Sequence, residues 1–157
     1  MIAAALSWAL MPGVPTVACG LEGAAAHVAE KAGAPKGTAD FLRVVAWHES
    51  RCITRAVGDG GRAVGAFQLH GLAAGGNARE PFRSALRASR DVPVLGTWVA
   101  AAYVTRLRRY VKRRCGDVSW AAIRRAWRKP SLACANNHEA NAVNRRFQAA
   151  KRRIKRG

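Results

Sequence analysis

Acidic residues are scarce in this chain of 157 residues, which has 9 Asp and Glu against 27 Lys and Arg and a formal charge of +18. No apolar stretch reaches the ~18–20 residues that cross a bilayer as a helix, so we expect no transmembrane segment. The four cysteines form no C-x-x-C pair, which argues against a zinc knuckle, and no metal site is expected. The chain also lacks internal repeats and low-complexity linkers, so its length suits one domain.

The positive charge is concentrated in the last third of the chain. Residues 1–100 hold 10 basic and 7 acidic side chains, whereas residues 101–157 hold 17 basic and 2 acidic ones, a net charge of +15. Most of the cations are Arg, whose planar guanidinium suits phosphate and carboxylate. The charge predicts an anionic partner, which is nucleic acid, an anionic membrane or a polymer such as a cell wall.

The cysteines and the N-terminal segment leave the cellular compartment open. The even cysteine count allows two disulfides in an oxidising compartment, and a Cys115–Cys134 bond would join the two ends of one helical segment. Four reduced, mostly buried thiols fit the sequence equally well. Residues 1–20 are apolar but have no basic start, so they show no clear signal peptide; we interpret them as a first helix, with a weak leader as the alternative. The main domain is then residues 21–157.

Hydrophobic periodicity predicts an α+β domain that is predominantly α-helical, with a small β-hairpin lobe. The last helix, capped by Asn136 or Asn137, is expected to fray from Lys151 onwards. The alternation over 64–70 places Gln68 on the face opposite Phe67. Helices are expected over 21–33, over 38–50 with Thr38 as the cap, over 81–89, over 92–114, from a cap at Asp117 or Ser119 to Trp127, and from about 137 to the end.

Residues 45–71 carry the most informative pattern. Glu49 ends an apolar helix, a glycine-rich turn follows, and an extended stretch then presents Gln68. A carboxyl at a helix C-terminus meets the negative end of the dipole and apolar neighbours, and both disfavour ionisation. We therefore expect a raised pKa for Glu49, opposed in part by Arg51 and Arg62. A carboxyl that stays protonated suits a general acid in the cleavage of a glycosidic bond.

This stretch resembles the soluble lytic transglycosylases and goose-type lysozymes of the lysozyme superfamily. Glu49-Ser50 is similar to the family's Glu-Ser motif, in which Glu is the catalytic acid/base at the end of a helix. The Gly-Ala-Phe-Gln at 65–68 is similar to its Gly-Leu-Met-Gln motif, whose last residue contacts the sugar. The Gly-Asp-Gly-Gly between them resembles the turn of goose-type enzymes. The resemblance covers roughly residues 38–130 and is specific only over 49–70.

The chain departs from the family late in the domain. Transglycosylases usually carry Ala-Tyr-Asn-x-Gly there, with a Tyr that supports the catalytic Glu, whereas residues 126–130 read Ala-Trp-Arg-Lys-Pro. Trp127 can line a cleft but has no phenol hydroxyl. Tyr103 is a possible substitute, although its helical spacing favours a place in the core. The departure bears on activity more than on the fold.

The resemblance implies one catalytic residue, Glu49. The alternative for Glu49 is a helix-end carboxylate paired with Arg51 or Arg55. Ser50 either contacts substrate or caps the helix, and Gln68 either faces the cleft or satisfies backbone groups of the turn, with the cleft favoured. The predicted substrate-binding residues are Ser50, Phe67, Gln68, Tyr103 and Trp127.

Asp59 separates two reaction types. An inverting hydrolase needs a second carboxylate about 6.5–9.5 Å from the acid, to activate water. In a transglycosylase the sugar's own C6 hydroxyl attacks, so one Glu is enough. Asp is favoured in such a turn for local hydrogen bonding, so a lytic transglycosylase is expected first. A goose-type muramidase that uses Glu49 with Asp59 is the alternative.

The predicted reaction is therefore cleavage of the β-1,4 bond between N-acetylmuramic acid and N-acetylglucosamine in peptidoglycan, leaving 1,6-anhydro ends. No cofactor is required. The alternative from another class is a non-catalytic structural or DNA-contacting virion protein on a lysozyme-like fold. Expected partners are peptidoglycan glycan strands, an anionic polymer (cell wall or packaged DNA) at residues 101–157, and other virion proteins. The expected location is a phage virion or the bacterial cell envelope.

Overall fold

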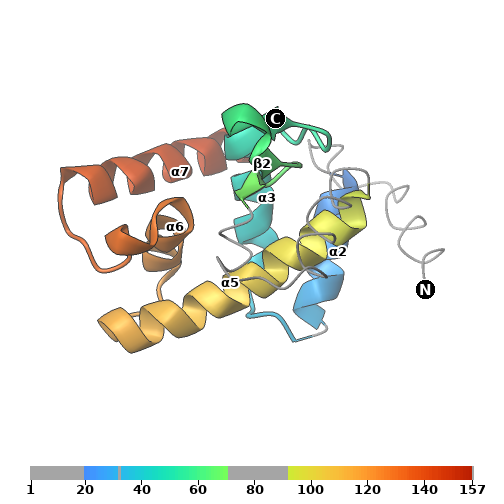
Figure 1. The fold of residues 1–157 in the computed structure, drawn as a ribbon. Helices are drawn as coiled ribbons and strands as arrows, with labels where there is room; N and C mark the ends of the chain where they lie inside the picture. Colours follow the sequence, from blue (N-terminus) through green and yellow to red (C-terminus); the bar gives the residue numbers. More distant parts are fainter. Residues whose placement is uncertain (1–19, 32, 71–91, 157) are drawn as a thin grey trace.

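The computed structural model describes residues 20–31, 33–70 and 92–156, in which helices predominate beside one small antiparallel sheet (Figure 1). The predicted α+β class with mostly helical content is confirmed. The predictions for residues 1–19 and for a helix at 81–89 lie outside the described residues. Within the described ranges, no helix is both long and apolar enough to span a membrane.

Five α-helices form the body of the described part. They are α2 (Gly20–Lys31), α3 (Thr38–Ser50), α5 (Pro93–Cys115), α6 (Trp120–Arg128) and α7 (His138–Arg156). α2 packs against α3 and α5, while α6 contacts both α5 and α7 (Figure 1). α3 also contacts α5 and α7, so the helix that ends beside Glu49 is held by neighbours from both halves of the chain.

The helix ends follow local sequence signals, with two differences. Ser119 caps α6 and Asn137 caps α7, each through a side-chain oxygen that accepts a backbone N–H. Thr38 is the first residue of α3 rather than its cap, and the cap position is taken by Gly37 in a left-handed conformation (φ 89°). α7 is helical through Arg156, whereas the sequence predicted that this basic end frays from Lys151.

Three two-residue strands make the sheet, in the order β1-β2-β3. They are β1 (Val57–Gly58), β2 (Ala63–Val64) and β3 (Leu69–His70), all antiparallel. The 3-10 turn η1 (Asp59–Gly61) joins β1 to β2. The predicted alternation over 64–70 is wrong, because residues 65–68 form a turn closed by the Gln68 N–H on the Gly65 carbonyl (3.1 Å).

Aromatic rings from four helices meet in the core. Phe41 of α3 stacks on Trp120 at 4.9 Å between ring centroids, and it also contacts Trp127 at 5.8 Å and Phe147 at 5.5 Å. Tyr103 of α5 lies 5.2 Å from Trp127. Burying each such ring stabilises the fold by roughly 1.5–3 kcal/mol. These contacts fix α3, α5, α6 and α7 relative to one another.

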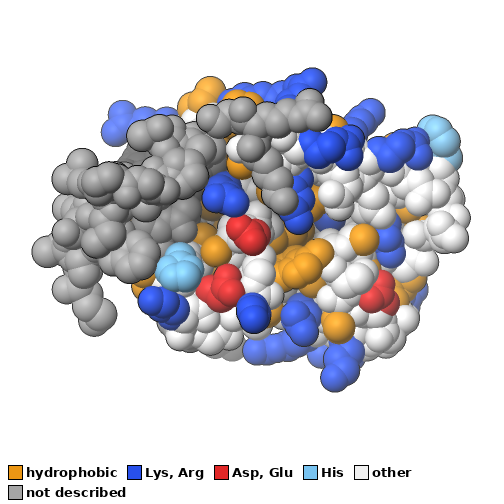
Figure 2. Space-filling view, turned by 180° about the vertical axis from the view of Figure 1, so that it is seen from behind, with side chains coloured by type: hydrophobic (Ala, Val, Ile, Leu, Met, Phe, Trp, Pro, Cys, Tyr) orange, Lys and Arg blue, Asp and Glu red, His pale blue; other side chains and the backbone are white. Residues whose placement is uncertain are grey.

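The surface reflects the shortage of acidic residues. On the face drawn in Figure 2, Lys and Arg side chains lie both along the edges and in the middle, and Asp and Glu side chains are few. α5, α6 and α7 together contain one acidic residue, Glu139, which lies 3.9 Å from Lys129. The positive charge predicted for the last third of the chain is therefore carried largely by helices that pack on the core.

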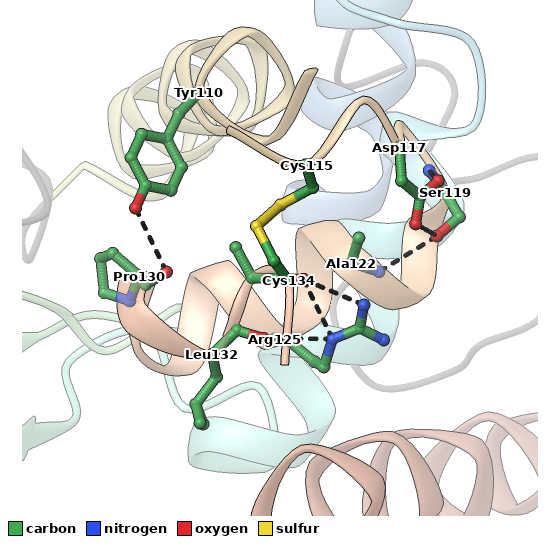
Figure 3. Close-up of a disulfide and its surroundings, with 10 residues drawn as sticks. Tyr110, Cys115, Asp117, Ser119, Ala122, Arg125, Pro130, Leu132 and Cys134 are labelled. Atoms are coloured by element: carbon green, nitrogen blue, oxygen red, sulfur yellow. Dashed lines mark hydrogen bonds between the residues drawn. A yellow bond between two sulfur atoms is a disulfide. The ribbon is translucent and has the colours of Figure 1, made fainter. Parts of the chain in front are cut away.

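A disulfide joins the C-terminal end of α5 to the segment after η2 (Pro130–Leu132), as Figure 3 shows. It links Cys115 to Cys134, which is the pairing that the sequence left open. Cys52 is also disulfide-bonded, so none of the described cysteines is a free thiol. Beside the bond, Arg125 donates to the Ala133 carbonyl from two nitrogens, at 3.2 and 2.9 Å. The disulfide and Arg125 together hold this segment against α6.

We expect the double substitution Cys115→Ala and Cys134→Ala to lower the free energy of unfolding by about 3 kcal/mol. The bond closes a loop with a sequence separation of 19, and its loss frees the unfolded chain. The melting temperature should fall by about 6–12 °C for a domain of this size, measured by circular dichroism. An unchanged melting temperature would contradict the expectation. In the double variant, any further fall in melting temperature on adding reductant then measures the contribution of the disulfide at Cys52.

Candidate active site

Glu49 lies in the last turn of α3, one residue before the helix ends. α3 stops because Arg51 and Cys52 both adopt left-handed backbone conformations, at φ 56° and 63°. Their N–H groups bond back to the carbonyls of Trp47 and Ala46, both at 3.1 Å. The carboxyl of Glu49 is thereby set at a fixed helix end, with 16 % of its side chain still exposed to solvent.

The Glu49 carboxylate is paired with Arg124, a residue of α6. Arg124 Nη2 donates to Glu49 Oε1 at 3.0 Å, and the Arg124 side chain is only 1 % exposed. The same nitrogen lies 3.1 Å from His48 Nδ1, and the guanidinium lies over the Phe147 ring at 5.5 Å from its centroid. α3, α6 and α7 therefore converge on this ion pair.

The sequence predicted other partners for Glu49. Arg51, one of the two candidates, instead donates to the Trp47 carbonyl at 2.9 Å and lies over the Trp47 ring at 5.1 Å. Arg124 is buried beside Ile123 in α6, a placement that the sequence did not indicate. A cation at a buried helix position requires a buried anion nearby.

The pKa of Glu49 is lowered, not raised as the sequence predicted. Burial of the carboxyl raises its pKa, but the contact with His48 (3.6 Å) and the charge of Arg124 lower it by more. The expectation rested on the helix dipole and apolar neighbours and did not include Arg124. Glu49 is therefore ionised at neutral pH.

Ser50 connects the two motifs that the sequence singled out. Its hydroxyl lies 3.2 Å from the Ala46 carbonyl within α3 and 2.8 Å from the Ala66 carbonyl in the turn between β2 and β3. The end of α3 and the 65–68 turn are thus joined directly. Arg51 holds the C-cap position, so Ser50 serves neither as the predicted cap nor, in this arrangement, as a free hydroxyl.

The Gln68 side chain is engaged within the sheet lobe. Its Nε2 lies within hydrogen-bond distance of the carbonyls of Ala56 (3.2 Å) and Gly65 (3.0 Å). Its Oε1 fills the space over Gly58, where any Cβ would collide with it. The amide therefore satisfies backbone groups of the turn, which is the alternative that the sequence did not favour.

The three aromatic residues predicted to contact substrate are buried to different extents. Phe67 is 3 % exposed and Tyr103 is 9 % exposed, and burial raises the pKa of the Tyr103 hydroxyl. Side chains this buried have little surface to offer a substrate, so the predicted substrate contacts of both are not supported. Trp127 is half-buried between Phe41 and Tyr103.

Asp59 has a local partner in the sheet lobe. Its Oδ2 lies 2.8 Å from His70 Nε2, and the Asp59 side chain is 61 % exposed. The contact ties η1 to β3, which agrees with the local role expected for Asp in a turn. Among the described residues, no group of three or more His, Cys, Asp and Glu is placed to hold a metal ion.

No family model, curated protein or solved structure matches this chain. The site consists of a helix-end carboxylate that solvent can reach, a buried arginine that holds it, and a serine that ties it to a small sheet.

Proposed function

We propose that the protein is a lytic transglycosylase with a lysozyme-like fold, which cleaves peptidoglycan with Glu49 as acid and base. The observation that carries the proposal is the placement of Glu49, partly exposed at the end of α3 and joined through Ser50 to the turn at 65–68. The end of α3 and the 65–68 turn, which carry the two motifs of the resemblance, are thus adjacent. A phage virion or the bacterial envelope is the proposed setting.

The proposed reaction needs one proton and returns it. Protonated Glu49 donates its proton to the glycosidic oxygen as the bond to N-acetylmuramic acid C1 breaks. The resulting carboxylate then accepts the proton of the C6 hydroxyl, whose oxygen bonds to C1 and closes the 1,6-anhydro ring. Arg124 stabilises the carboxylate formed in the first step, and it also lowers the fraction of Glu49 that is protonated beforehand.

The surroundings of Asp59 support transglycosylation over hydrolysis. A hydrolase of the goose type would use a second carboxylate to activate water. The Asp59 carboxylate is instead engaged with His70 in an exposed turn. The muramidase that uses Glu49 with Asp59 therefore remains the second choice among the enzymes.

A non-catalytic role has one observation in its favour, which is the Glu49–Arg124 pair itself. A carboxylate held by a buried arginine can serve the fold alone, since breaking a buried pair is costly. The chain would then be a structural virion protein, and loss of Glu49 would affect stability without a reaction to lose.

Mass spectrometry of digested peptidoglycan separates these functions. Purified sacculi are incubated with the full chain, and the released muropeptides are identified by mass. Anhydro ends, which are one water lighter than hydrolytic ends, are the expected product. Hydrolytic ends would instead assign a muramidase. Intact sacculi, under conditions where a known lytic enzyme releases fragments, would contradict both enzymes.

A further inference from the structure

A line of polar side chains runs along the outer face of α7. Asn141, Arg145, Gln148 and Arg152 are all exposed, and their spacings of four, three and four residues place them on one side of the helix. Together with the half-buried Asn144 they form one continuous polar surface on α7. None of these side chains is acidic.

The opposite side of α7 is fixed to the core. Ala140, Phe147 and Ala150 are buried there, and Phe147 contacts Phe41 of α3 as well as Arg124 of α6. α7 has 19 residues, which gives a helix about 28 Å long. The outer line is therefore presented by a helix that packs on the core.

Further cations flank the line. Arg146, Lys151 and Arg153 are exposed on α7 outside the line. Figure 2 shows Lys and Arg side chains along the edge where α7 runs. The one acidic residue of α7, Glu139, lies in its first turn near Lys129. The outer surface thus has neutral amides and arginines in the middle and cations beside them.

We propose that α7 binds duplex DNA by lying in the major groove. The groove is about 12 Å wide and admits an α-helix. Arg pairs with guanine edges, and Asn and Gln pair with adenine edges. Arg, Asn and Gln are the residue types of the line. The flanking cations would contact phosphates. An anionic wall polymer would use the cations but gives no reason for Asn141 and Gln148.

This site is separate from Glu49, so a failure of DNA binding would not contradict the proposed cleavage of peptidoglycan, and a failure of cleavage would not contradict DNA binding.

The test measures binding of a fluorescent pool of duplexes, each of about 20 bp with a randomised centre, by anisotropy at fixed salt. Arg145→Gln with Arg152→Gln should weaken binding more than tenfold. The matched control is Arg109→Gln with Arg113→Gln, two exposed residues of α5 with the same change in charge, which should weaken it less than about threefold.

A second variant tests the groove without changing the charge. Asn141→Ala with Gln148→Ala should also weaken binding, by about tenfold, of duplexes that the wild type has selected from this pool. Equal losses in the α5 and α7 arginine variants would overturn the proposal, because binding would then follow total charge. Unchanged binding in the amide variant would overturn it too. So would a poly(glycerol phosphate) competitor that displaces duplex as well as unlabelled duplex does, at equal phosphate concentration.

Discussion

Glu49→Gln is expected to reduce the release of muropeptides by about 10²–10⁴-fold, since the amide cannot supply the proton that the glycosidic oxygen needs. The same substitution removes the anion that faces Arg124, whose side chain is 1 % exposed. Breaking a buried pair in this way costs about 3 kcal/mol. The variant should therefore lose stability as well as activity, which thermal unfolding will show.

The two losses have to be separated, because an unstable enzyme is also an inactive one. Activity is therefore measured well below the melting temperature of the variant, and normalised to the folded fraction. Glu139→Gln is a suitable control, since Glu139 is exposed and its contact with Lys129 is long (3.9 Å). It should change neither quantity appreciably. Activity of Glu49→Gln close to that of the wild type would contradict the assignment of Glu49 as the catalytic acid.

In the profile of kcat/KM against pH, Arg124→Met is expected to move the limb where activity falls at high pH (the high-pH limb) to higher pH. The acid step requires protonated Glu49, and the charge of Arg124 lowers the pKa of that carboxyl. Removing the cation raises the pKa and enlarges the protonated fraction at neutral pH. On the limb, activity changes about tenfold for each pH unit by which the limb moves. A profile of kcat/KM against pH measures the shift.

Arg124→Lys is the matched control for this shift, because it keeps the charge and changes the geometry. Its limb should stay near that of the wild type, even if its rate falls. A limb that stays in place in Arg124→Met would contradict the assignment of Glu49 as the acid. A rate that falls equally at every pH, in both variants, would leave Arg124 a role in positioning alone and would contradict the proposed effect on the pKa.

Stability should depend on pH through the same pair. Because the folded-state pKa of Glu49 is lowered, the pair stabilises the fold above the unfolded-state pKa. That contribution is lost as the pH falls through the folded-state pKa. Arg124→Met lacks it, so its deficit of about 3 kcal/mol at neutral pH should narrow in the acid range.

The helical framework could be predicted because its signals are local. The apolar positions of α7 from Ala140 to Ile154 repeat with the period of a helix, and Ser119 and Asn137 are strong caps. The position of Glu49 at a helix end follows from the same kind of pattern. These features depend on neighbours within a few residues.

The surroundings of Glu49 could not be predicted, because they depend on which faces of distant helices meet. Glu49 and Arg124 are 75 residues apart, and periodicity alone does not say that α6 turns Arg124 toward α3. The direction of Gln68 was missed for another reason. A strand would alternate its side chains, but Gln68 has a left-handed backbone (φ 47°) in a turn.

The most direct test of Glu49 as the catalytic residue is the activity of Glu49→Gln combined with Arg124→Met. This double variant removes both charges, so no uncompensated charge is left buried and the fold should recover part of the stability lost in Glu49→Gln. Release of anhydro-muropeptides from sacculi is then measured at matched folded fraction. We predict that stability returns toward that of the wild type while activity stays at the level of Glu49→Gln. Activity that recovers together with stability would contradict the assignment.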